Sequence, residues 1–273
     1  NYSAEMSSKE EEITNLTNPQ DEEQQRIALL ETVALPYEIG GALQGYLQNP
    51  MDQDWYKLNT TNAGIYQFDI PTPANNMPVL ELYELIEGKD ETGKSYKALS
   101  PVSTNVDFNW SSWTETIKNT FMAGLKANKT YFLAVNPNYS TGQIPYDGYQ
   151  ITSKLLVGNP GDAYEENDKP EQVKDFPATG VKANFAVSND IDTYYFTAKE
   201  TATYGVNFFR TPLTSDLKNK YQQELLNPFY GLIMLTEDVN KNRKAEDSDN
   251  ERSTYILNLT EDGTNTGSFK DIR

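Results

Sequence analysis

Residues 188–196, SNDIDTYYF, place an asparagine and two aspartates directly before an aromatic run that predicts a β-strand. Residues 50–58, PMDQDWYKL, place aspartates at the same two positions before an aromatic run of their own. Asp52 and Asp54 are thus each 138 positions away from a matching aspartate, Asp190 and Asp192. This spacing indicates that one strand, together with its acidic lead-in, occurs twice in the chain.

The match at a spacing of 138 residues extends beyond the aspartates. Residues 64–70, GIYQFDI, fall on residues 202–208, ATYGVNF, so that the tyrosines of the two stretches coincide. Further pairs of apolar positions coincide as well: Leu43 with Val181, Leu47 with Phe185, and Phe68 with Val206. An ungapped match over residues 43–70 indicates two copies of one domain.

Both copies have the pattern of β-strands, because apolar residues alternate over short runs rich in aromatic and β-branched types. In the first copy the expected strands are WYKL, GIYQFDI, VLELYEL, YFLAV and YQITSKLL. In the second copy they are TYYF, TYGVNFF, YGLIMLTE and STYILNL. Short strands joined by polar loops predict an all-β protein with two tandem jelly-roll-like β-sandwich domains and minor helices.

The turn-rich stretch GNPGD at residues 158–162 marks the expected domain boundary. We therefore expect a partly helical N-terminal extension at residues 1–35, one sandwich at residues 36–157 and a second at residues 158–273. Asn18 and Pro19 form a helix start in the extension, and residues 215–226 have the apolar spacing of a surface helix. The second sandwich is expected to be incomplete at its C-terminus, with one or two further strands lying beyond Arg273 or coming from elsewhere.

The composition excludes several classes of function. The chain of 273 residues has 40 acidic and 23 basic residues and a formal charge of −17, which disfavours binding to nucleic acid or to an anionic membrane. It contains no histidine and no cysteine, so thiolate nucleophiles, Cys/His zinc sites and Ser-His-Asp arrangements are excluded. No apolar run approaches the roughly 20 residues that span a bilayer.

Residues 162–168, DAYEEND, followed by DIDTYYF at residues 190–196, together resemble the bacterial pre-peptidase C-terminal domain family. The first copy carries the later elements of that family as DQDWY at residues 52–56 and NKTYF at residues 128–132. The resemblance implies a jelly-roll-like sandwich that is appended to secreted bacterial proteases and other surface proteins. It also implies kinship with the collagen-binding domains of clostridial collagenases, which bind calcium through the acidic opening and the aspartates before the core strand.

Carried over to this sequence, the resemblance implies a Ca²⁺ site in the second copy. Calcium takes six to eight hard oxygen ligands, and the candidates are Glu165, Asn167, Asp168, Asp190 and Asp192. The sequence departs from the family at Ala163, where the collagenase relatives place an acid, and at Glu166, where a proline is usual. The alternative is that the aspartates cap turns by accepting backbone N–H groups. Capping is the expected role of Asp52 and Asp54, because the first copy lacks the acidic opening.

Two other stretches are candidates for binding. Residues 238–249, DVNKNRKAEDSD, have the spacing of an EF-hand loop, but Arg243 stands at the sixth position, where a glycine-like turn is required, so a charged hairpin loop is favoured. Trp110 and Trp113, three residues apart in a polar stretch, could form a stacking platform for sugar rings or a collagen-like ligand. The alternative for these tryptophans is a place in the core.

These features favour a non-catalytic extracellular or cell-surface module, secreted or attached to the wall of a bacterium, that binds an extracellular protein or a polysaccharide. One alternative is a structural spacer or a surface subunit that self-assembles through an unpaired strand edge. A less favoured alternative is a glycoside hydrolase that uses carboxylates alone. The ligand, the parent protein and the oligomeric state do not follow from the sequence.

Overall fold

The computed structural model describes residues 19–71, 77–89, 92–109, 112–138, 148–158, 162–165, 167, 172–183, 191–209, 229–237, 241–243, 250–259 and 264–272. The chain divides into two compact units. Unit 1 consists of Asn1–Ala163 and Ala183–Asp190, and unit 2 consists of Tyr164–Lys182 and Ile191–Arg273. No helix among the described residues is long and apolar enough to cross a membrane.

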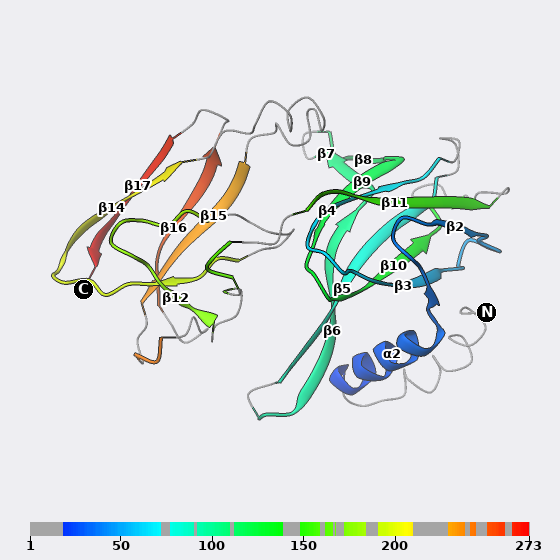
Figure 1. Ribbon diagram of the computed structural model, residues 1–273, viewed down its shortest axis with the longest axis horizontal. Helices are drawn as coiled ribbons and strands as arrows, with labels where there is room; N and C mark the ends of the chain where they lie inside the picture. The colour runs from blue at the N-terminus through cyan, green and yellow to red at the C-terminus, as the bar shows by residue number, and fades with distance from the viewer. Residues whose placement is uncertain are drawn as a thin grey trace. The chain divides into compact units, whose positions relative to one another are not determined.

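Unit 1 is a sandwich of two β-sheets (Figure 1). The five-stranded sheet has the order β1 (Leu35–Pro36), β3 (Asp54–Asn59), β10 (Thr130–Asn136), β5 (Val79–Lys89) and β6 (Ser95–Thr104). The four-stranded sheet has the order β2 (Ala42–Gly45), β11 (Tyr149–Gly158), β4 (Gly64–Asp69) and β9 (Thr120–Leu125). All neighbouring strands run antiparallel except β1, which pairs parallel with β3. The predicted all-β sandwich is confirmed in this unit.

The core of unit 1 lies between the two sheets and follows from the alternation of apolar residues in the sequence. In β4, every second residue is buried, including Tyr66 and Phe68, while the residues between them are partly exposed. β10 has β3 and β5 at its two edges, one of its faces packs in the core between the sheets and the other contributes Phe132 to the cluster with α2, so six of its seven residues are buried. The face of β10 that points between the sheets carries Tyr131, Leu133 and Val135.

The helix predicted in the N-terminal extension is present as α2 (Pro19–Val33). Pro19 occupies its first position, where a missing backbone N–H costs nothing. Ile27 and Leu30 are buried in a second apolar cluster with Leu85 and Phe132, which come from β5 and β10. The helix therefore covers part of the outer face of the five-stranded sheet.

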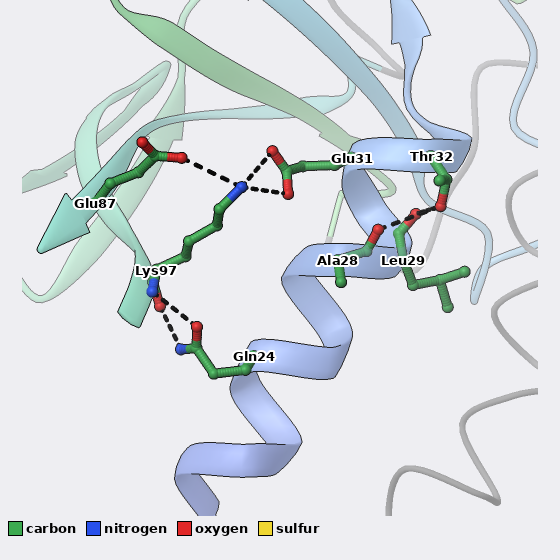
Figure 2. A network of polar contacts seen from close by, with 7 residues as sticks. All are labelled: Gln24, Ala28, Leu29, Glu31, Thr32, Glu87 and Lys97. Carbon is green, nitrogen blue, oxygen red and sulfur yellow. Dashed lines mark hydrogen bonds and ion pairs between the residues drawn. The ribbon is translucent and has the colours of Figure 1, made fainter. Parts of the chain in front are cut away.

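A polar network attaches α2 to the edge strand β6 (Figure 2). The side-chain amide of Gln24 donates to the carbonyl oxygen of Lys97 at 2.6 Å and accepts from the backbone N–H of Lys97 at 2.7 Å. The Lys97 ammonium binds Glu31 of α2 at 2.8 Å and Glu87 of β5 at 3.2 Å. Gln24 thus gives Lys97 the two hydrogen bonds that a neighbouring strand would give.

Other features also protect the edges of the sandwich against pairing with a foreign strand. Pro101 lies within β6 and has no backbone N–H to offer a partner. The hydroxyl of Ser103 donates to the carbonyl oxygen of Met122 in β9 at 2.9 Å, which links the edges of the two sheets. A short separate hairpin, β7 (Val106–Asn109) with β8 (Thr114–Ile117), connects β6 to β9.

The described residues of unit 2 form three strand pairs. These are β12 (Lys174–Asp175) with β13 (Tyr194–Tyr195), β14 (Ala202–Phe209) with β17 (Thr264–Ile272), and β15 (Phe229–Glu237) with β16 (Asn250–Leu259). The first pair is parallel and the other two are antiparallel. All four strands expected in the second copy are present, and β17 is an additional strand. The helix expected at residues 215–226 lies outside the described residues, and the arrangement of unit 2 as a second sandwich stays a prediction.

Candidate functional site

The structure brings together two of the five residues expected to bind calcium, Asn167 and Asp192. The side-chain amide of Asn167 donates to Oδ1 of Asp192 at 2.9 Å. Asn167 is 0% exposed, and its carboxamide oxygen is buried without a hydrogen-bond partner. A buried amide oxygen that has lost its water and gained no donor destabilises the folded state by about 1–3 kcal/mol. This oxygen stays a candidate metal ligand, on a side chain that is hydrogen-bonded to the Asp192 carboxylate.

Aromatic packing fixes the position of this pair in unit 2. Asp192 lies two residues before β13, and Asn167 lies in the acidic opening, three residues after Tyr164. The rings of Tyr164 and Tyr194 meet edge to face with 5.7 Å between their centroids, and Phe176 meets Tyr194 in the same manner at 5.8 Å. Tyr194 thus links the opening segment to the start of the core strand.

The other expected ligands are only partly described. Glu165 is half-buried, and its Oε1 atom is shielded from solvent. Asp168 and Asp190 lie outside the described residues. Within the part of the chain that the structure describes, no group of three acidic side chains is placed so that it could hold a metal ion. The carboxylates and the carboxamide oxygen are hard oxygen donors, which fit Ca²⁺ better than a soft transition metal.

In unit 1, the first of the matching aspartates caps a turn, as expected. Asp52 is 3% exposed, and its Oδ2 accepts the backbone N–H of Gln48 at 2.8 Å. The backbone N–H of Asp52 donates to the carbonyl oxygen of Asn49 at 3.1 Å and closes the same turn. The capping alternative is therefore confirmed for Asp52.

The second aspartate of unit 1 has a partner that the sequence does not reveal. Tyr149, at the start of β11 in the opposite sheet, donates its hydroxyl hydrogen to Oδ2 of Asp54 at 2.6 Å. The Tyr56 and Tyr149 oxygens are 2.5 Å apart, and since Tyr149 uses its hydrogen on Asp54, Tyr56 must be the donor between them. Gly45 leaves space for the Tyr149 hydroxyl, because a Cβ atom at this position would overlap it. The carboxylate is thus satisfied by a hydroxyl from 95 residues away.

Burial shifts the pKa values of this chain of groups. Burial raises the pKa of Asp54, the hydrogen bond from Tyr149 lowers it, and the charge of Asp52 raises it further. Burial also raises the pKa of Tyr56 to about 12. The pKa of Tyr149 is raised by burial and then by its neighbours Tyr56 and Asp54. Both tyrosines are therefore neutral hydrogen-bond donors at neutral pH.

The two tryptophans proposed as a stacking platform are not both described. Trp113 is 75% exposed at the end of the β7–β8 hairpin, so the core alternative is wrong for this residue. Its backbone has a φ of 55°, a left-handed conformation that is uncommon for a bulky side chain. Trp110 lies outside the described residues. A role of the exposed Trp113 indole in stacking on a ligand stays a prediction.

The EF-hand-like stretch at residues 238–249 connects β15 and β16, so the predicted hairpin is confirmed. Arg243, at the sixth position, has a φ of 61° and so adopts the turn for which such loops use glycine. Its guanidinium forms an ion pair with Asp175 and lies 4.7 Å from the ring centroid of Tyr195. Of the residues at ligand positions of such a loop, Asn242 is described, whereas Asp238, Asn240, Glu246 and Asp249 lie outside the described residues.

No protein-family profile and no curated protein matches the sequence. Several solved structures are similar to part of the chain, among them the following two. One is the pre-peptidase C-terminal domain of a collagenase from Bacillus anthracis, the family that the sequence motifs resemble, with 14% identity, a TM-score of 0.26, and coverage of 44% of this chain and 94% of that chain. The other is CorA, a surface-associated copper-binding protein of Methylomicrobium album BG8, with 7% identity, a TM-score of 0.30, and coverage of 45% of this chain and 98% of that chain.

Proposed function

We propose that this chain is a non-catalytic binding or accessory module of a bacterial secreted or cell-surface protein, and that Ca²⁺ stabilises its unit 2. The observation that carries the proposal is the buried carboxamide of Asn167, which touches Asp192 and has a free oxygen beside that carboxylate. Glu165, Asp168 and Asp190 would complete the set of oxygen donors. A bound ion would neutralise the carboxylates and give the Asn167 oxygen its missing partner.

A structural role agrees with the placement of the groups whose pKa values are shifted. Asp54, Tyr56 and Tyr149 form a series of hydrogen bonds in which both tyrosines belong to the buried core of unit 1. The sequence contains no histidine or cysteine that could act as a nucleophile or a general base near neutral pH. These features favour a binding or accessory role over turnover of a substrate.

Calcium is expected to raise the thermal midpoint of unit 2. An ion that binds only the folded state at 100 times its Kd stabilises by about 2.7 kcal/mol, which for a domain of about 100 residues raises the midpoint by on the order of 10 °C. Thermal unfolding with millimolar calcium and with chelator measures this shift. Asp192→Asn is expected to abolish the shift, whereas Glu200→Gln, at an exposed position of the same unit, is expected to leave it unchanged.

If calcium has no effect and Asp192→Asn destabilises equally with and without the ion, Asp192 is a turn cap and the proposed ion site is wrong. A loss of the shift in the Glu200→Gln variant as well would mean that calcium acts through the general negative charge of the chain, not at this site.

Binding of an extracellular protein or polysaccharide is expected to depend on Trp113. A buried aromatic anchor at an interface contributes about 2 kcal/mol or more, so Trp113→Ala is expected to weaken binding more than tenfold. Pull-down on immobilised collagen and on insoluble polysaccharides, followed by titration of the surface that retains the protein, measures this loss. Tyr46→Ala, which removes another exposed aromatic ring of unit 1, is the matched control and should bind normally. Equal binding by wild type and Trp113→Ala would rule out a role for the indole.

A further inference from the structure

Two aspartates at matching positions of the two units have different partners. Asp54 accepts a hydroxyl from Tyr149, whereas Asp192, 138 positions later, accepts an amide from Asn167. The difference matters because the Tyr149 hydroxyl gives its one hydrogen to Asp54 and accepts a hydrogen bond from Tyr56, so its oxygen has partners. The carboxamide of Asn167, in contrast, keeps a buried oxygen without a donor.

The local structures around the two aspartates correspond, so the comparison is between like positions. A two-residue strand pairs parallel with the core strand in both units, β1 with β3 and β12 with β13. The backbone N–H that follows this short strand donates to the core strand at 2.8 Å in each case, from Tyr37 to Lys57 and from Phe176 to Tyr195. A turn then follows in each, closed by a hydrogen bond of 3.0 Å to Glu38 and of 2.9 Å to Pro177.

In unit 1 the space beside the carboxylate is filled by protein. The Tyr149 hydroxyl lies against Gly45, where even a Cβ atom would not fit. The neighbouring Asp52 is 3% exposed and holds the backbone N–H of Gln48. The Tyr56 hydroxyl in turn donates a hydrogen bond to the Tyr149 hydroxyl. Each of the two carboxylates thus accepts a hydrogen bond from a donor of the protein itself, inside the unit.

We propose that Tyr149 does for unit 1 what a calcium ion does for unit 2, so that calcium controls the folding of unit 2 alone. This inference rests on the proposed calcium site and extends it to the regulation of the whole chain. Unit 1 stays folded when the ion is removed, because the donors to Asp52 and Asp54 belong to the protein itself. Unit 2 loosens when the ion is removed, because the buried oxygen of Asn167 is then left without a partner. The chain therefore combines an ion-independent sandwich with an ion-dependent unit.

Hydrogen exchange, read by mass spectrometry in calcium and in chelator, tests the proposal on the intact chain. Calcium is expected to slow exchange at least tenfold in β13 and β14 and to leave β3 and β4 unchanged. Equal slowing in both units would overturn the selective control and leave the calcium site standing. No slowing in either unit would overturn both the selective control and the calcium site.

A double-mutant cycle tests the role given to Tyr149. Tyr149→Phe keeps the ring and removes the hydroxyl, so the urea midpoint of unit 1 is expected to fall by the same amount in calcium and in chelator. Adding Asp54→Asn to Tyr149→Phe is expected to recover most of that loss, because the carboxylate that lacks its donor is then neutral. Losses that simply add in the double variant would show that the hydroxyl does not act through Asp54, and would overturn this role.

Discussion

Replacing Phe68 with alanine is expected to lower the free energy of unfolding of unit 1 by about 3–5 kcal/mol. Phe68 is 0% exposed in the middle of β4, and its ring stacks on that of Phe121 in β9 with 5.0 Å between centroids and 10° between planes. Alanine would leave a cavity between two sheets whose backbones are held by antiparallel pairing on both sides of β4. Urea unfolding, with hydrogen exchange to assign the transition to unit 1, measures the loss.

Trp113→Ala is the matched control, because it removes an even larger aromatic side chain from the surface of the same unit. Its effect on stability is expected to stay within about 0.5 kcal/mol. If Phe68→Ala cost no more than Trp113→Ala, the two sheets would not enclose a close-packed core at β4.

The strands could be predicted because burial in a sandwich produces a strict alternation along each strand. The expected runs WYKL, GIYQFDI, VLELYEL, YFLAV and YQITSKLL coincide with β3, β4, β5, β10 and β11. β6 was not predicted, because its residues SYKALSPVST include a proline and its outer edge is covered by α2 instead of by a strand. β17 was not predicted either, since TNTGSFKDI has few apolar residues. Strands of this kind depend on pairing partners that sequence alternation does not identify.

The docking of α2 shows the same limit for a helix. Asn18, Pro19 and the spacing of Ile27 and Leu30 predict the helix and its apolar face. They do not predict that the Gln24 side chain forms hydrogen bonds with the backbone of Lys97, because these two residues are 73 positions apart. A glutamine on a helix is more often solvated, and its role becomes visible only once β6 is placed as an edge strand.

Only the residues of the candidate site that lie in local sequence motifs could be predicted. The pairing of Asn167 with Asp192 follows the expectation from the acidic opening and the core strand. Tyr149 was missed, since it lies in a run that reads as an ordinary strand and meets Asp54 only through the stacking of two sheets. Gly45 was the one available signal, because a glycine inside a short strand indicates a close approach by another group. Calcium binding, an extracellular ligand and self-association through a strand edge stay predictions.

The sandwich also depends on Gly64, and Gly64→Ala is expected to lower the free energy of unfolding of unit 1 by about 3 kcal/mol. A Cβ atom at Gly64 would overlap the carbonyl oxygen of Val157 and come within 2.9 Å of the Gly158 Cα atom. These are backbone atoms of β11, at a place where its pairing with β4 already contains an irregularity between Leu155 and Val157. β4 is held on its other side by its pairing with β9, which restrains it from moving away from β11. Urea unfolding of unit 1 measures the loss.

Gly93→Ala separates this steric effect from the general cost of removing a glycine. Gly93 has a φ of 82°, which disfavours alanine by about 1–2 kcal/mol, but nothing lies within 4 Å of its added Cβ atom. The excess loss in Gly64→Ala over Gly93→Ala therefore measures the contact with β11. Hydrogen exchange is expected to rise in β11 and β4 for Gly64→Ala and only near residue 93 for the control. Similar losses in the two variants would mean that β11 can shift away from β4, and that the register of the four-stranded sheet is not held at Gly64.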